Sequence, residues 1–126
     1  MLWYHSSIMN KLRVAVVGIG HLGSIHSRIY QKTRNCSLVA VCDIDKTRLN
    51  QISQELKSPG YTDYQALFDK VDAVSIAVPT KLHYKIACDF LKQNIHTLVE
   101  KPFTTSLKEA DSLIKIAKTN NLILQV

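Results

Sequence analysis

Three glycines near the start of the chain have the spacing of a turn that binds phosphate. Gly18, Gly20 and Gly23 form the pattern G-x-G-x-x-G directly after an apolar run at 12–17. In such a turn the first glycine permits a tight bend, the second lets a pyrophosphate approach the backbone, and the third lets a helix pack on its strand. The pattern is specific only between a strand and a helix, and both are expected here. Because the backbone amides at the helix start bind the phosphates, no lysine is required.

An acidic residue follows the second apolar run. Asp43 lies 20 residues after Gly23, at the interval where a carboxylate accepts hydrogen bonds from the ribose of a dinucleotide. A carboxylate there repels a 2′-phosphate, which favours NAD over NADP. Two features leave alternatives open. Lys46 and Arg48 are near enough in sequence to bind a 2′-phosphate, and Asp43 could instead cap a helix together with Asp45.

Apolar runs alternate with amphipathic stretches along the chain. The runs predict buried strands, and apolar residues spaced by three and four predict helices between them. We expect strands at 12–17, 38–42, 73–78, 95–99 and 122–126. We expect helices at 24–32, 46–56 and 63–68, another that begins near 80, and one that runs from 106 to about 120. This alternation predicts a doubly wound α/β domain, Rossmann-like, with a mostly parallel sheet and helices on both faces.

Local signals also predict how the helices begin and which faces they bury. Ser106 and Glu109 have the spacing of a capping box, in which each side chain satisfies a backbone amide of the other residue. We expect Asp63 and Thr80 to cap the helices that follow them. The apolar face of the first helix is expected to consist of Leu22, Ile25 and Ile29.

Length and composition exclude several classes of protein. The chain has 126 residues and a formal charge of +6, but its 16 lysines and arginines are scattered, which indicates a solvated surface and no nucleic-acid partner. The apolar runs fall well short of the roughly 18 residues of a membrane helix. We expect residues 1–10 to be an N-terminal extension and residues 11–126 to be one domain.

The cysteines indicate a reducing compartment. Cys36, Cys42 and Cys88 are odd in number and include no C-x-x-C pair, so they predict neither a metal site nor a disulfide framework. We expect three reduced thiols in a cytoplasmic protein, with Cys42 a small residue of the core.

Two later segments narrow the family. The segment Ala77-Val78-Pro79-Thr80 ends the third apolar run and leads to His83, and Glu100-Lys101-Pro102 follows the fourth run. With the glycine motif and His26, this set resembles the N-terminal domain of the glucose–fructose oxidoreductase, inositol dehydrogenase and rhizopine catabolism (Gfo/Idh/MocA) family over residues 11–126.

The resemblance implies which residues bind the cofactor. The turn at 18–23 would hold the pyrophosphate and Asp43 the adenosine ribose, while 78–80 would pass along the middle of the dinucleotide. Glu100 and Lys101 would lie near the nicotinamide ribose and the substrate. In the family, the peptide bond that corresponds to Lys101–Pro102 is often cis. The implied set is Gly18, Ile19, Gly20, His21, Leu22, Gly23, Asp43, Val78, Pro79, Thr80, His83, Glu100 and Lys101.

Lys101 is the candidate catalytic residue. A lysine held beside a bound nicotinamide can orient a substrate hydroxyl and lower its pKa. The alternative is an ordinary loop lysine that pairs with Glu100. His83 and His26 each have a structural alternative as well, since a histidine in the first turns of a helix often only caps or packs.

The resemblance implies hydride transfer between nicotinamide and a carbinol carbon of a sugar, inositol or polyol. Family enzymes have a second domain with most of the substrate pocket and the oligomerising sheet, so homo-oligomers are possible and we expect this chain alone to bind dinucleotide without turnover. Two alternatives remain. One is a non-catalytic dinucleotide sensor or partner-binding module, and the other is a Rossmann-like domain for another nucleotide ligand, such as a nucleotide-sugar or S-adenosylmethionine, against which Glu100-Lys101-Pro102 argues.

Overall fold

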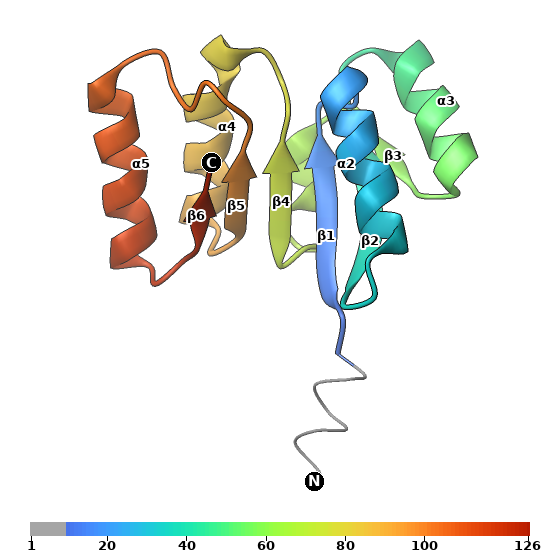
Figure 1. The fold of residues 1–126 in the computed structure, drawn as a ribbon, viewed down its shortest axis with the longest axis horizontal. Coiled ribbons are helices and arrows are strands. Elements are labelled where there is room, and N and C mark those ends of the chain that lie inside the picture. Colours follow the sequence, from blue (N-terminus) through green and yellow to red (C-terminus); the bar gives the residue numbers. More distant parts are fainter. Residues whose placement is uncertain (1–9) are drawn as a thin grey trace, which may run out of the picture.

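The computed structural model describes residues 10–126, which form a six-stranded parallel sheet in the order β3-β2-β1-β4-β5-β6 (Figure 1). The predicted extension at 1–10 lies outside the described residues except for its last one. The strands are β1 (Leu12–Val17), β2 (Cys36–Cys42), β3 (Gly60–Tyr61), β4 (Ala73–Ile76), β5 (His96–Val99) and β6 (Leu124–Gln125). The sheet confirms the predicted doubly wound α/β fold.

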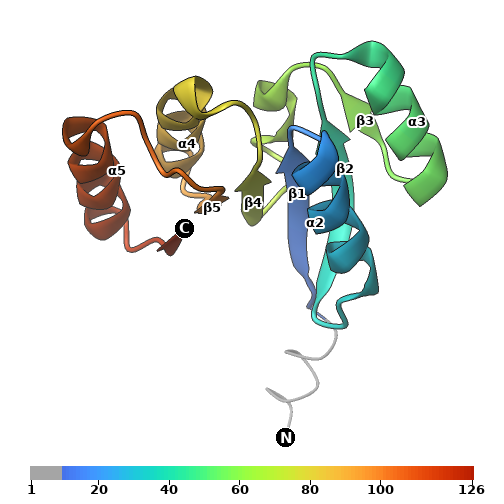
Figure 2. The same cartoon turned by 45° about the horizontal axis from the view of Figure 1, so that its top comes forward.

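Four α-helices and two 3₁₀ helices connect the strands. The α-helices are α2 (His21–Lys32), α3 (Lys46–Leu56), α4 (His83–Lys92) and α5 (Leu107–Thr119), and the 3₁₀ helices are η1 (Tyr64–Leu67) and η2 (Thr80–Leu82). Figures 1 and 2 show α2 and α3 at one end of the sheet and α4 and α5 at the other. The chain runs outward from β1 to β3 and then returns to β4, so the strand order reverses between β1 and β4.

The two faces of the sheet bury separate cores. Alternate residues of β1 take part in each, because successive strand residues point to opposite faces. Val17 belongs to the larger core, beneath α4 and α5, where Phe90 and Leu113 are fully buried. Val16 belongs to the smaller core, where Ile52 of α3 packs. Strands that are buried on both faces explain the continuous apolar runs of the sequence.

Most predicted elements are present, with different ends. β1 and α3 match their predicted bounds, whereas β4 ends at Ile76 and β6 spans only Leu124–Gln125. The short helix after Asp63 is a 3₁₀ helix, and Asp63 caps it by accepting from Gln65 N at 2.9 Å. The two-residue strand β3 was not predicted, because Pro59 and Gly60 within a short polar segment indicate a break in structure.

The predicted buried face of α2 is wrong. Leu22, Ile25 and Ile29 are 49%, 38% and 56% exposed. The helix instead buries small residues, including Gly23 and Ser27, and Ser27 Oγ donates to Gly23 O at 2.8 Å. The first turns of the helix approach the sheet closely and bury small side chains, whereas Tyr30 near its end packs against the smaller core and hydrogen-bonds to Ser75 of β4.

Two predicted helix starts also differ from the structure. Thr80 contributes no cap, since Pro79 precedes η2 and Leu82 precedes α4, neither with a side-chain hydrogen bond. The capping box is only half formed. Ser106 Oγ accepts from Glu109 N at 3.2 Å, but Glu109 Oε1 accepts from the hydroxyl and amide of Thr105, at 2.8 and 3.3 Å. The extended backbone at Ser106 places the Thr105 groups within reach of that carboxylate.

Neighbouring residues of α5 give a matched test of this packing. Leu113 is fully buried in the larger core, whereas Ile114 is 43% exposed. Leu113→Ala should lower the free energy of unfolding by about 2–5 kcal/mol, because it leaves a cavity that the core cannot refill. Ile114→Ala should lower it by less than about 1 kcal/mol. Urea denaturation followed by circular dichroism measures both, and equal losses would contradict the packing of α5.

Candidate functional site

A cavity of about 630 Å³ opens at the carboxyl ends of the strands, between the loops that follow β1, β2 and β4. It lies where the strand order reverses, which is where open α/β sheets bind their ligands. The predicted site residues that line it are Gly18, Gly20, Asp43, Val78 and Pro79. The structure therefore brings together loops that the sequence places up to 60 residues apart.

Each glycine of the turn has a different steric environment. Gly18 has a φ of +87°, and an added Cβ would lie 2.7 Å from Ala77 O. At Gly23 an added Cβ would lie 1.6 Å from Gly18 O. At Gly20 the nearest atom to an added Cβ is Arg48 Nη1, at 3.8 Å. The fold therefore requires Gly18 and Gly23, whereas a Cβ at Gly20 would only enter open space at the start of α2.

The start of α2 supplies the amides that such a turn offers to an anion. Gly20 is the N-cap of the helix, and the first turn contains no acidic residue. First-turn amides have no partner within a helix and carry the positive end of its dipole. Ile19 is an exception among the predicted backbone contacts, because its amide donates to Asp43 Oδ2 at 2.9 Å. The amides of His21 and Leu22 are the ones that follow the N-cap.

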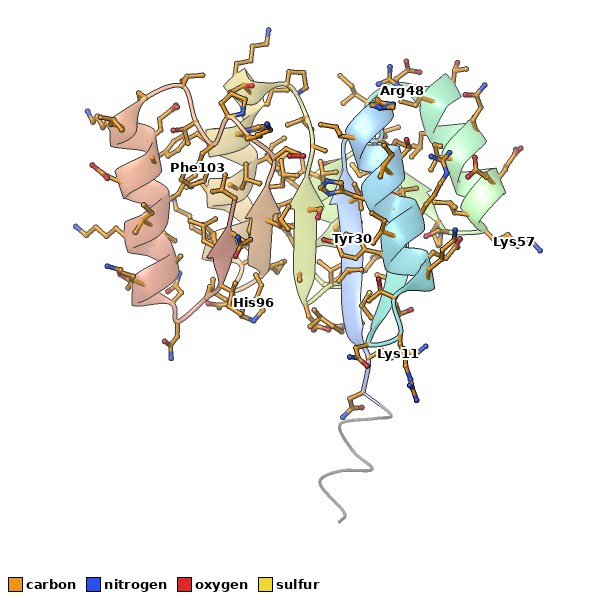
Figure 3. All side chains as sticks on the ribbon, in the orientation of Figure 1. Lys11, Tyr30, Arg48, Lys57, His96 and Phe103 are labelled. Carbon is orange, nitrogen blue, oxygen red and sulfur yellow. The ribbon has the colours of Figure 1, made fainter. Side chains whose placement is uncertain are left out.

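Asp43 connects the end of β2 to the glycine turn. Its Oδ2 accepts from Ile19 N, and its Oδ1 accepts from Asp45 N at 2.8 Å. Asp45 caps α3 by accepting from Arg48 N at 3.1 Å, so Asp43 is not the helix cap. The Asp43 side chain is 7% exposed but lines the cavity, and Arg48 Nη1 lies 3.5 Å from its Oδ2. Figure 3 shows Arg48 beside the start of α2.

The opposite wall of the cavity was not predicted from the sequence. It contains Tyr64 from η1 and Lys85 from α4. Tyr64 Oη donates to Asp89 Oδ2 at 2.6 Å, and Lys85 Nζ donates to the same oxygen at 2.8 Å. Burial, reinforced by Asp89, raises the pKa of Tyr64, which keeps the hydroxyl protonated as a donor. No local motif marks these residues, since they meet only through the fold.

The Glu100-Lys101-Pro102 segment follows β5, next to the β4 loop. The Lys101–Pro102 bond is cis, as the resemblance implied. Glu100 Oε2 lies 3.5 Å from His26 Nε2, and Glu100 Oε1 accepts from the backbone amide of Lys101 at 3.3 Å. Lys101 is exposed and lies outside the lining of the cavity. The geometry leaves Lys101 accessible at the end of β5.

His83 does not face the cavity. His83 is the first residue of α4 and is 1% exposed. Nε2 lies 2.8 Å from Val78 O, and Nδ1 lies 3.0 Å from Pro102 O and 3.1 Å from Phe103 O. In this structure His83 contacts the loops beside the cavity and not the cavity itself. Thr80 is the first residue of η2 and also lies outside the lining.

The cavity contains one thiol, from Cys42. Burial, with a smaller effect of Asp43, raises the pKa of the Cys42 thiol to about 12, so it remains protonated at neutral pH. All three cysteines are buried and free, in agreement with the sequence. Within residues 10–126 no group of histidine, cysteine and acidic residues is arranged to hold a metal ion.

Membrane insertion can be judged from the helices. Among those of the described part of the chain, none combines the length and the apolar character that crossing a membrane requires.

A phosphate-binding glycine turn, an acid at the end of β2 and a cavity at the switch point define an NAD(P)-binding domain of the Rossmann type. Comparison with known proteins places this domain more closely. The family model of oxidoreductases with an NAD-binding Rossmann fold, named Gfo/Idh/MocA, matches residues 12–126. The chain belongs to this family.

Named relatives include two enzymes with bacterial sources. A UDP-N-acetylglucosamine 3-dehydrogenase from Acidithiobacillus ferrooxidans is 36% identical over 94% of this chain and 37% of its own length. The scyllo-inositol 2-dehydrogenase (NAD(+)) of Bacillus subtilis is 32% identical over 93% of this chain and 35% of its own. The chain thus spans little more than a third of these relatives.

Two solved structures have the same fold over nearly the whole of this chain. The Acidithiobacillus ferrooxidans enzyme superposes with a TM-score of 0.87 at 37% identity, over 93% of this chain and 38% of its own. The structure of GenD2, from gentamicin A biosynthesis, in complex with NAD superposes with a TM-score of 0.90 at 27% identity, over 94% of this chain and 34% of its own.

The glycines of the turn provide a matched test of the phosphate site. Gly20→Ala should leave the free energy of unfolding within about 1 kcal/mol of the original value, because the new Cβ meets only the end of Arg48. It should weaken NADH binding by at least about tenfold, because the Cβ occupies the phosphate position. Gly23→Ala should destabilise the fold by about 3 kcal/mol or more, since its Cβ overlaps Gly18 O.

Thermal unfolding and NADH fluorescence titration separate these two effects. Unchanged NADH binding by Gly20→Ala would show that the turn does not hold the pyrophosphate.

Proposed function

We propose that this chain is the cofactor-binding part of a dehydrogenase that transfers hydride between nicotinamide C4 and a carbinol carbon of a sugar, inositol or related polyol. The observation that carries the proposal is the open space over Gly20 at the start of α2, inside the cavity. The names of the relatives support the substrate class, because they act on a nucleotide-linked amino sugar and on an inositol.

Each part of the cavity has a role in this proposal. The amides of His21 and Leu22 hold the pyrophosphate, aided by the helix dipole. The remaining lone pairs of Asp43 accept from the adenosine ribose, while Val78 and Pro79 border the middle of the dinucleotide. The nicotinamide, when bound, supplies the hydride acceptor or donor. Glu100 and Lys101 stand on the neighbouring loop, where Lys101 orients the substrate hydroxyl and favours loss of its proton.

NAD is the preferred cofactor in this proposal. The carboxylate of Asp43 is nearly buried and held by two backbone amides, so it cannot turn away from a 2′-phosphate. Arg48 partly offsets its charge at 3.5 Å and can itself pair with that phosphate, since its side chain is 48% exposed. We therefore infer that NADPH binds more weakly than NADH but is not excluded.

Two substitutions test this preference. Asp43→Ala should weaken NADH binding by about tenfold, the effect of losing hydrogen bonds to a charged group. It should weaken NADPH binding less, because the repulsion is removed as well. Arg48→Ala should weaken NADPH and leave NADH nearly unchanged. Isothermal titration calorimetry with both cofactors gives the ratio of affinities, which a general loss of stability would not alter. A ratio that neither variant changes would contradict this assignment.

Turnover is expected to require more than this chain. It spans 37% of the UDP-N-acetylglucosamine 3-dehydrogenase, and half a cleft supplies only part of the orientation on which the rate depends. The 126-residue chain with NAD and myo-inositol, scyllo-inositol or UDP-N-acetylglucosamine should therefore form no NADH above the rate of a Lys101→Ala control. Absorbance at the NADH band measures this. Steady turnover that Lys101→Ala abolishes would show that the chain alone is a complete enzyme.

A further inference from the structure

His83 lies between two loops that are adjacent in space and distant in sequence. One is the loop after β4, which supplies Val78 O, and the other is the loop after β5, which supplies Pro102 O and Phe103 O. The ring sits at the start of α4 and is 1% exposed. Both of its nitrogens therefore point at backbone oxygens, one on each side.

The chemistry of these contacts makes the ring a bridge. A carbonyl oxygen only accepts, so each hydrogen bond uses an N–H of the imidazole. The neutral ring has one N–H and hydrogen-bonds one loop while packing on the other, whereas the protonated ring donates to both. His83 therefore hydrogen-bonds one loop when the ring is neutral and holds both loops only when both ring nitrogens carry a proton.

The bridged atoms are close to groups that matter for the proposed function. Val78 lines the cavity, and Pro102 directly follows Lys101. Phe103 packs against the larger core, and Figure 3 shows it between α4 and α5. The loop after β5 is therefore held by the packing of Phe103 on the core and by the contacts of His83 with Pro102 O and Phe103 O. The side chain of Lys101, in the same loop, is exposed.

We propose that His83 is a positioning residue, which sets the 100–103 loop against the β4 loop and so places Glu100 and Lys101 over the nicotinamide half of the dinucleotide. It acts through the backbone of both loops and does not itself contact the cofactor. This role rests on the proposed function, because it presupposes that the cavity holds a dinucleotide whose nicotinamide end reaches the 100–103 loop.

Two variants can each retain the hydrogen bonds on only one side of the His83 ring. His83→Gln carries an amide nitrogen near the position of Nε2, so it can retain the bond to Val78 O and loses the bonds to Pro102 O and Phe103 O. His83→Asn carries its amide nitrogen near Nδ1 and can retain the opposite side. His96→Asn is the control. His96 is the first residue of β5, at the opposite end of that strand from the 100–103 loop, and its Nδ1 accepts from Ile123 N at 3.0 Å.

Two ligands distinguish binding of the adenosine half of the cofactor from binding of its nicotinamide half. ADP contains the adenosine and the pyrophosphate but lacks the nicotinamide and its ribose, whereas NADH is complete. Affinities for both are measured by titration calorimetry on each variant, after circular dichroism has shown that the variant is folded. We expect His83→Gln to weaken NADH binding about tenfold and ADP binding by less than about threefold. His83→Asn should weaken NADH less than His83→Gln does, and His96→Asn should change neither.

The outcomes are distinguishable. Equal weakening of both ligands by His83→Gln, or none, overturns the positioning role while the proposed function stands, because the original chain still binds both. Failure of the original chain to bind either ligand overturns the proposed function and this role with it. If His83→Gln does not fold, the amide signal of Lys101 in His83→Asn gives the second test. It should stay near its original chemical shift, and a large displacement there contradicts the bridge.

Discussion

The close approach of α2 to the first strand is the constraint on which the rest of the structure depends. An added Cβ at Gly23 would lie 1.6 Å from Gly18 O, so the turn and the helix touch backbone to backbone. Because of that contact, the helix begins at the carboxyl ends of the strands, and Gly20, its N-cap, lines the cavity. Near the same contact the helix buries small side chains, such as Ser27, against the sheet, and the larger Tyr30 packs farther along the helix. The position of the phosphate site and the packing of α2 therefore have one cause.

Asp43 combines an observed structural role with its proposed role in recognition. Its two oxygens hold the Ile19 and Asp45 amides, which ties the end of β2 to the glycine turn. This restraint keeps a nearly buried carboxylate aimed into the cavity, where Arg48 lies close enough to moderate its charge. His83 plays a comparable part on the other side, since it joins the loops after β4 and β5 through backbone oxygens. Both side chains hold backbone segments in place, and in the proposed function only Asp43 also contacts the ligand.

The fold was largely predictable because its signals are local. The run at 12–17 is apolar except for Arg13, because its strand is buried on both faces from Val14 onward, and α3 follows its apolar periodicity from Lys46 to Leu56. The predicted face of α2 was wrong because periodicity does not reveal how near a helix lies to its sheet. The capping box at Ser106 was half right, because the direction of the Glu109 carboxylate depends on the backbone before the helix.

By itself, the sequence determined the type and order of the elements, the glycine turn and the acid that follows β2. These depend on side-chain period and on the backbone freedom of glycine, which neighbouring residues settle among themselves. Only the tertiary structure decided that Tyr64 and Lys85 complete the cavity wall, that Glu100 pairs with His26, and that His83 is a buried bridge rather than a wall of the site. Those contacts join residues far apart in the chain, and their partners are selected by the way the sheet brings the loops together.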